Sequence, residues 1–103
     1  MSECIFCKIA RKEIESSILY EDEDIIAFKD ISPKAPVHVI IIPKKHFSGV
    51  TDLKPRRDFK IFAKLFNGVA EVVSRTGISE SGFRVVLNQG IDAGQAIKHI
   101  HLH

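Results

Sequence analysis

The sequence predicts a single α+β domain, in which an antiparallel sheet of about five strands packs with one short and one long helix. Length is the first reason, because 103 residues are enough for one domain with one modest core. The second reason is pattern: short apolar runs separated by turn residues predict strands, whereas one long segment repeats its apolar residues at helical spacing. No repeat or linker divides residues 1–103, so we expect one domain with the element order α-β-β-β-α-β-β.

The first half of the chain predicts a short helix, a hairpin and a third strand. Residues 5–10 have the apolar spacing of a helix. Two apolar runs, 18–20 and 25–28, flank an acidic stretch and predict a hairpin with a charged turn. After two prolines force a loop, the β-branched run 37–42 predicts a strand that is buried on both faces and ends at the next proline.

The clearest predicted helix covers residues 57–75 and ends at Gly77. It has two adjacent apolar stripes, so its apolar arc spans about 220° at ~100° per residue, more than one sheet needs. In a chain this short we interpret the excess as a self-association surface, the alternative being a helix sunk deep in its own core. The main stripe consists of Phe59, Phe62, Ala63, Phe66, Val69, Ala70 and Val73, and the second of Ile61, Leu65, Gly68 and Val72.

The last third predicts two strands, 83–87 and 97–103, joined by the glycine-containing loop 88–95. Histidines alternate with hydrophobic residues in the final strand, so three imidazoles project from one face, about 7 Å apart at successive Cα atoms. Strand alternation gives no reason for three histidines, because Thr, Lys or Glu are commoner at such positions. Two functional explanations stay open, a metal cluster and a phosphate-reacting site. The three residues are His99, His101 and His103.

Imidazole suits phosphoryl or nucleotidyl transfer, because its neutral ring is nucleophilic near pH 7. Glycines in the preceding loop let backbone N–H groups approach phosphate oxygens, and Asn88 and Gln95 can donate as well. By itself the loop is a weak signal, since it does not match the P-loop pattern and such loops are common hairpin connections.

Composition excludes several other classes of function. The chain has 15 basic and 13 acidic side chains, and a net charge of +2 is too balanced for a nucleic-acid binder that works by electrostatics alone. The longest apolar stretch, 37–42, is far short of the roughly 20 residues of a membrane-spanning helix. The first residues lack the pattern of a signal peptide, so we expect a cytoplasmic protein without disulfides.

Segment 94–103 resembles the signature of the histidine-triad family, His-φ-His-φ-His-φ-φ with φ hydrophobic. Residues 5–9, 27–33 and 35–46 resemble, in order, the N-terminal blocks of its Hint-like branch. The resemblance implies a HIT-like fold, a homodimer whose sheets join, binding of a purine nucleotide such as AMP or GMP, and hydrolysis of nucleoside phosphoramidates or related nucleotide conjugates. A non-catalytic nucleotide-binding protein, a hydrolase of dinucleoside polyphosphates and a small metal-binding module are the alternatives.

The resemblance also implies roles for individual residues. His101 would attack the α-phosphorus, His99 and His103 would flank it, and His38 would support these imidazoles from the neighbouring strand. Asp30 would accept hydrogen bonds from the ribose hydroxyls. The base would lie against Ile5, Phe6, Ile9, Phe28 and Ile31, and the phosphate side would involve Asn88, Gly94, Gln95, Ala96, His101 and His103.

Two features depart from the family pattern. Ala96 stands where the phosphoramidase branch often has a serine that helps the leaving group, so leaving-group preference is expected to differ. The signature continues with two hydrophobic residues and a C-terminal segment that the 103 residues do not include, so we expect the family domain to extend past His103.

Cys4 and Cys7 form a Cys-x₂-Cys pair, which supplies half of a tetrahedral zinc shell. The resemblance selects His46 and His99 as the other two ligands of a structural zinc ion. Two reduced thiols without metal are the alternative. If zinc holds His99, the tautomer of this ring is fixed and the residue braces His101.

Overall fold

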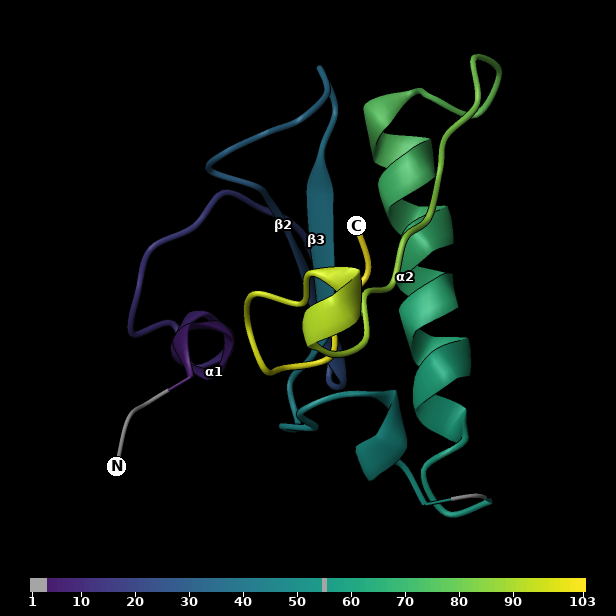
Figure 1. Ribbon diagram of the computed structural model, residues 1–103. Helices are drawn as coiled ribbons and strands as arrows, with labels where there is room; N and C mark the ends of the chain where they lie inside the picture. The colour runs from purple at the N-terminus through teal and green to yellow at the C-terminus, as the bar shows by residue number, and fades with distance from the viewer. Residues whose placement is uncertain (1–3, 55) are drawn as a thin grey trace.

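A three-stranded antiparallel sheet forms the centre of the computed structural model, which describes residues 4–54 and 56–103 (Figure 1). The predicted α+β class is confirmed. The elements are α1 (Ile5–Ala10), β1 (Ile18–Glu21), β2 (Ile25–Lys29), β3 (Val39–Pro43) and α2 (Lys60–Thr76), with short 3₁₀ helices at Val50–Asp52 and Ile91–Ala93.

The predicted hairpin is confirmed, and an aspartate side chain closes its charged turn. Strands β1 and β2 pair antiparallel with Ile18 opposite Phe28. Between them, Asp22 Oδ1 accepts hydrogen bonds from the backbone N–H groups of Asp24 (2.8 Å) and Ile25 (3.0 Å). These bonds favour the charged form of the Asp22 carboxyl and lower its pKa, although desolvation acts in the opposite direction.

Strand β3 pairs antiparallel with β2, but it begins at Val39, two residues later than predicted. Pro43 was expected to stop this strand and is instead its last residue. A proline is tolerated at a strand end because it removes one N–H donor and keeps its carbonyl. His38 therefore lies immediately before the strand, at the end of the loop that carries Asp30.

The predicted strands 83–87 and 97–103 are not regular strands, so the prediction of about five strands is wrong for the described residues. Each segment is nevertheless held beside the sheet. Leu102 forms an isolated antiparallel bridge with Ile41, and His103 exchanges two backbone hydrogen bonds with Val86, at 2.8 and 2.9 Å.

Proline explains why the bridge does not grow into a ladder. The pairing of Ile41 with Leu102 brings Pro43 level with Ile100, and proline has no N–H to donate. The N–H of Ile100 donates instead to the carbonyl oxygen of Phe47 (2.7 Å). The final segment therefore leaves β3 after one bonded pair.

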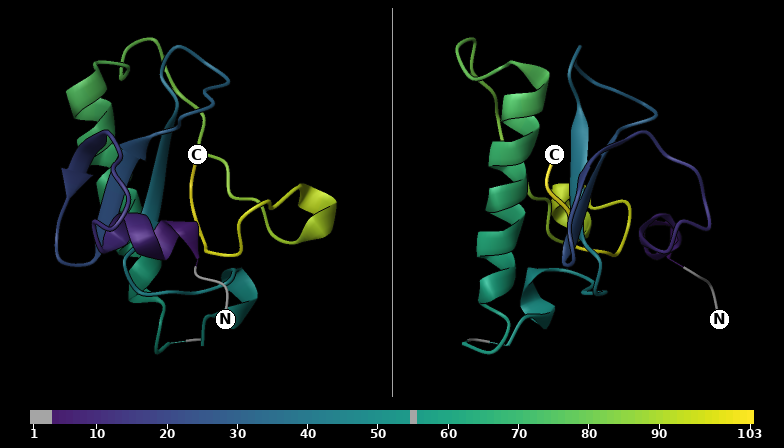
Figure 2. Two further views of the ribbon diagram at one scale, coloured as in Figure 1. Left: turned by 90° about the vertical axis from the view of Figure 1, so that its left-hand side faces the viewer. Right: turned by 180° about the vertical axis from the view of Figure 1, so that it is seen from behind.

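The sheet separates the two helices, with α2 covering one face and α1 lying beside the other (Figure 2). Each face has its own apolar cluster. The α2 face contains Ile25, Ala27, Val39, Ile41, Leu65, Val72 and Leu102. The α1 face contains Phe6, Ile9, Ile26, Phe28, Ile40 and Ile42.

Helix α2 turns its predicted second stripe, not its main stripe, toward the sheet. The buried residues of the helix are Leu65, Gly68 and Val72. Gly68 allows the close approach, because a Cβ there would lie 2.4 Å from Ile25 Cδ1. Phe66 stays 52% exposed, because small side chains let the helix backbone approach the sheet where phenylalanines would not fit. Gly77 ends the helix with φ 70°, as predicted.

The described helices include none that is long and apolar enough to cross a membrane.

Candidate functional site

Three imidazoles lie in a row between the end of the chain and the loop before β3. The ring centroids of His38 and His103 are 5.2 Å apart, and those of His103 and His101 are 4.8 Å apart. His101 is 6% exposed, because Phe6 of α1 packs edge-on against its ring at 5.1 Å. Phe6 also contacts the ring of His99, so α1 covers His99 and His101, whereas the sequence suggested only that the histidines point away from the core.

The ring of His101 is oriented by a backbone carbonyl. Its Nδ1 lies 2.7 Å from the carbonyl oxygen of His99, and a carbonyl can only accept a hydrogen bond. Nδ1 therefore carries the proton in the neutral ring, and Nε2 keeps a free lone pair. This is the tautomer that a nucleophilic histidine needs.

A second hydrogen-bond chain fixes the proton positions in His38 and His103. The backbone N–H of Lys34 donates to His38 Nδ1 (2.9 Å), so the neutral ring of His38 carries its proton on Nε2. That nitrogen lies 3.0 Å from His103 Nδ1 and 3.4 Å from Asp30 Oδ2. When His38 donates to His103 Nδ1, the neutral His103 carries its remaining proton on Nε2.

Burial favours the neutral form of His103. Desolvation lowers its pKa from the usual value, and repulsion from His101 and His38 acts in the same direction, while the carboxylate of Asp30 opposes them. Asp30 is itself held in place, because its Oδ1 accepts the backbone N–H of Ser32 (2.8 Å).

The four residues predicted as metal ligands converge on one point. The Sγ atoms of Cys4 and Cys7 and the Nδ1 atoms of His46 and His99 all lie within 4.8 Å of one another. His99 Nδ1 is 3.1 Å from His46 Nδ1, 3.3 Å from Cys4 Sγ and 3.5 Å from Cys7 Sγ. Tetrahedral zinc with usual bond lengths separates its ligand atoms by about 3.3–3.8 Å, so the donor set and its spacing fit this metal.

His99 is oriented toward that cluster by β3. Its Nε2 donates to the carbonyl oxygen of Pro43 (2.8 Å), which leaves the lone pair of Nδ1 for the cluster. The side chain is fully buried, and desolvation lowers its pKa to about 4. The ring is therefore neutral, as a metal ligand must be.

The predicted phosphate loop is turned partly on itself. The N–H of Gly94 donates to Ile91 O (3.1 Å), and the N–H of Gln95 donates to Gly90 O (3.0 Å). The backbone N–H groups of Gly94 and Gln95 are therefore engaged within the loop in this conformation, and their contact with phosphate stays a prediction. No hydrogen bond between described residues uses the N–H of Ala96 or the side chain of Asn88, so these two donors stay available.

The residues predicted to hold the base divide into two groups. Phe6 and Phe28 make an edge-to-face contact at 5.6 Å within the buried cluster on the α1 face, where Ile9 also lies. Ile31 is 93% exposed and Ile5 is 44% exposed. The structure thus gathers three of the five and leaves Ile5 and Ile31 at the surface.

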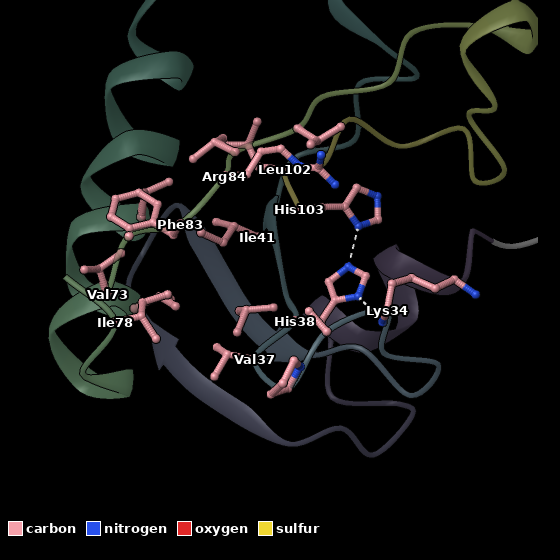
Figure 3. Close-up of a pocket in the computed structure, with 18 residues that line it drawn as sticks. Lys34, Val37, His38, Ile41, Val73, Ile78, Phe83, Arg84, Leu102 and His103 are labelled. Atoms are coloured by element: carbon pink, nitrogen blue, oxygen red, sulfur yellow. Dashed lines mark hydrogen bonds between the residues drawn. The ribbon is translucent and has the colours of Figure 1, made fainter. Parts of the chain in front are cut away.

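A cavity of about 470 Å³ lies on the face of the sheet that α2 covers, and not on the α1 face (Figure 3). His103, which pairs with Val86, is one of the residues that line it. None of the predicted base-binding residues lines it. Figure 3 shows His38 and His103 on one side, with their hydrogen bond, and Val73, Ile78 and Phe83 on the other. Periodicity could not reveal this cavity, because its walls come from segments far apart in the sequence.

Comparison with known proteins agrees with this geometry. A family model described as "scavenger mRNA decapping enzyme C-term binding" matches residues 3–103. The purine nucleoside phosphoramidase of Escherichia coli (strain K12) is 39% identical over 101 residues, which are 98% of this chain and 84% of that protein. The HIT family hydrolase from Clostridium thermocellum superposes with a TM-score of 0.94 at 43% identity, over 100% of this chain and 89% of the other.

The chain belongs to the histidine-triad (HIT) family. A third relative, the "14 kDa zinc-binding protein" of Zea mays, is 45% identical over 104 residues, covering 99% of this HIT protein and 80% of the relative. Because the matches to these relatives cover at least four fifths of both chains, the resemblance seen in the sequence extends over almost all of this chain.

The low pKa of His99 makes the stability of the metal-free HIT protein depend on pH. Unfolding releases His99 to bind a proton near its ordinary pKa of 6.5, whereas the folded protein resists protonation down to about 4. We expect the free energy of unfolding, measured with urea and a chelator, to fall as pH is lowered from about 6.5 toward 4. Ring ¹⁵N shifts are expected to show the Nε2–H tautomer until pH is near 4, and a titration near 6.5 would contradict this.

Proposed function

We propose that this HIT protein hydrolyses purine nucleoside phosphoramidates or related nucleotide conjugates, with His101 as the nucleophile. The observation that carries the proposal is the hydrogen bond from His101 Nδ1 to the carbonyl oxygen of His99, which leaves Nε2 free to attack. The phosphoramidase activity named for the Escherichia coli relative supports the same chemistry.

The reaction would occur in two displacements. First, the lone pair of His101 Nε2 forms a bond to the α-phosphorus while the bond from phosphorus to the leaving group breaks, and an amine leaving group takes up a proton from solvent water. Second, water attacks the nucleotidyl-imidazole, releasing a nucleoside monophosphate and restoring the neutral ring. A covalent intermediate divides one difficult displacement into two easier ones.

Several groups near His101 suit the phosphate. His103, which accepts from His38 at Nδ1, has its Nε2–H available for a phosphate oxygen. Asn88 lies two residues after Val86, which pairs with His103, and we propose that its side-chain amide also donates to the phosphate. The free N–H of Ala96 is a third donor.

The nucleoside would lie on the α1 side of the imidazole row. Asp30 is held beside His38 and can accept from two ribose hydroxyls, since a carboxylate has four lone-pair positions. We place the base over Ile5, Phe6, Ile9, Phe28 and Ile31, with exposed Ile5 and Ile31 as the residues free to contact it.

Ala96 favours a second substrate class. Its methyl group cannot pass a proton to a leaving amine, whereas a phosphate leaving group of a dinucleoside polyphosphate needs less protonation. We therefore keep hydrolysis of dinucleoside polyphosphates as the second candidate. Both classes would form the same nucleotidyl intermediate on His101.

The intermediate provides the direct test of His101. Rapid quenching of the HIT protein with an adenosine phosphoramidate is expected to give a protein mass increased by one adenylyl group, mapped to His101 by proteolysis. His101→Ala should lose both this adduct and turnover, by at least about 10³-fold, because no other ring has the same free Nε2 geometry. AMP binding without adduct or turnover in the wild type would favour a non-catalytic nucleotide-binding protein instead.

We also propose that Cys4, Cys7, His46 and His99 hold a structural zinc ion. The converging Sγ and Nδ1 atoms support this, as does the name of the Zea mays relative. Zinc would supply a fixed tetrahedral link between α1, the 46–52 loop and the final segment. Because His99 also accepts the hydrogen bond of His101, the metal would restrain the nucleophile through one residue.

The zinc content of variants distinguishes metal binding at the Cys4, Cys7, His46 and His99 cluster from metal binding at the histidine triad. Purified protein is expected to bind one zinc per chain, and Cys4→Ser should weaken it by at least about tenfold, because a thiolate ligand is lost. His101→Ala, which removes a triad member outside the cluster, should keep the metal. Elemental analysis and chelator competition measure both, and the opposite pattern would assign the metal to the triad.

Self-association is a further part of the proposal. On the stripe of helix α2 beside the one buried against the sheet, Phe66 is 52% exposed, and Phe59, just before the helix, is 70% exposed. Adjacent exposed aromatic rings are typical of an interface. We propose that a second copy of the chain covers this stripe in a homodimer.

Charge on the exposed stripe should disrupt the dimer. In sedimentation equilibrium, Phe66→Glu is expected to raise the dimer dissociation constant by at least about tenfold, since a carboxylate would be buried without a partner. Asn67→Glu, one residue along on the same helix, is the charge-matched control and should have a smaller effect. A monomeric wild type would refute the dimer.

A further inference from the structure

The side chain of Gln95 is fully engaged in holding the glycine-containing loop. Its Oε1 accepts the backbone N–H of Gly90 (2.8 Å), and its Nε2 donates to the carbonyl oxygens of Ser48 (2.7 Å) and Ile97 (3.2 Å). One amide thus closes the loop across its ends and ties it to residue 48. The sequence suggested that the Gln95 amide can donate to phosphate. In the structure, both its Oε1 and its Nε2 form hydrogen bonds within the protein.

Gln89, at the start of the loop, contacts the same segment as Gln95 does, residues 48–50. Its Oε1 accepts the backbone N–H of Val50 (2.7 Å). Gly49 makes room for this contact, because a Cβ at that position would lie 2.3 Å from Gln89 Oε1. Two glutamines therefore fasten the start and the end of the loop to the segment 48–50.

The two available phosphate donors lie directly outside this pair of glutamines. Asn88 precedes Gln89, and Ala96 follows Gln95. The loop between them contains two glycines of positive φ, Gly90 (78°) and Gly94 (76°), and glycine restricts the backbone less than other residues do. Without a fixed connection, the distance between the two donors would vary with the loop.

We propose that Gln95, assisted by Gln89, is a positioning residue that fixes the Asn88 amide and the Ala96 N–H for the phosphate of a bound nucleoside 5′-monophosphate. The inference rests on the proposed function and adds a residue that acts through others. Preorganised donors bind an anion more tightly than mobile donors, because no ordering of the loop opposes binding. The effect should therefore depend on the phosphate and not on the nucleoside.

Comparison of AMP with adenosine tests this dependence. Dissociation constants for both are measured by calorimetry or NMR titration for the wild type, Gln95→Met, Gln95→Glu and Gln89→Glu. Gln95→Met keeps the length of the side chain and adds no charge. The two glutamate variants add the same charge, but Gln89→Glu keeps the acceptor for Val50, whereas Gln95→Glu loses both donated hydrogen bonds.

Both Gln95 variants are expected to weaken AMP binding about tenfold while adenosine binding stays within about twofold of the wild type. Gln89→Glu should weaken AMP binding no more than about threefold. Gly49→Ala, which displaces the Gln89 side chain without changing either glutamine, should again weaken AMP selectively. This variant tests the assisting role of Gln89, and Gln95→Glu, compared with Gln89→Glu, carries the test of Gln95 if Gln95→Met fails to fold by circular dichroism.

Two results would overturn the inference. Parallel loss of AMP and adenosine binding in Gln95→Met would make the residue a general support of the site, and unchanged AMP binding would show that the amide positions nothing. If the wild-type protein does not bind AMP, the proposed function itself is refuted. This result differs from failure of the inference, because it is seen without any substitution.

Discussion

The hydrogen bond from His99 Nε2 to the carbonyl oxygen of Pro43 is the interaction on which the rest of the site depends. It attaches the final segment to β3 at the position where proline has ended the backbone ladder. It also directs the lone pair of Nδ1 into the Cys4, Cys7 and His46 cluster. Loss of one buried hydrogen bond of this kind costs about 1–3 kcal/mol in general. Here the loss would also release the His99 ring from β3 and remove the constraint that directs its Nδ1 into the cluster.

Backbone groups fix the tautomers of His38, His99 and His101. A carbonyl can only accept and an N–H can only donate, so each such contact fixes one imidazole tautomer. The carbonyl of His99 gives His101 a free Nε2, whereas the N–H of Lys34 gives His38 a protonated Nε2. Neighbouring residues of one type therefore acquire different roles from the chain around them, without differing in their own chemistry.

The local pattern of the sequence predicted much of the fold and several members of the site. Alternation and turn residues predicted the hairpin and β3, and the spacing of the cysteines predicted half of the cluster of Cys4, Cys7, His46 and His99. Helix α2 shows the limit of periodicity: two adjacent stripes were visible, but the close approach permitted by Gly68, not hydrophobicity, decides which one meets the sheet. The strand pattern of residues 97–103 likewise could not reveal that Pro43 interrupts the pairing of this segment with β3, because Pro43 lies far away in the sequence.

The sequence by itself determined which groups are available: five imidazoles, two thiols, a carboxylate before a loop, and a flexible glycine-containing segment. Only the tertiary structure decided which groups stay free. It brings Gln95 to Ser48, 47 residues away, and so converts a predicted phosphate donor into a structural contact. It also covers His101 with Phe6 and engages Nδ1 of this ring with the carbonyl oxygen of His99, so that Nε2 keeps its lone pair. Hydrogen-bond partners distant in sequence depend on how the layers pack, which no local spacing encodes.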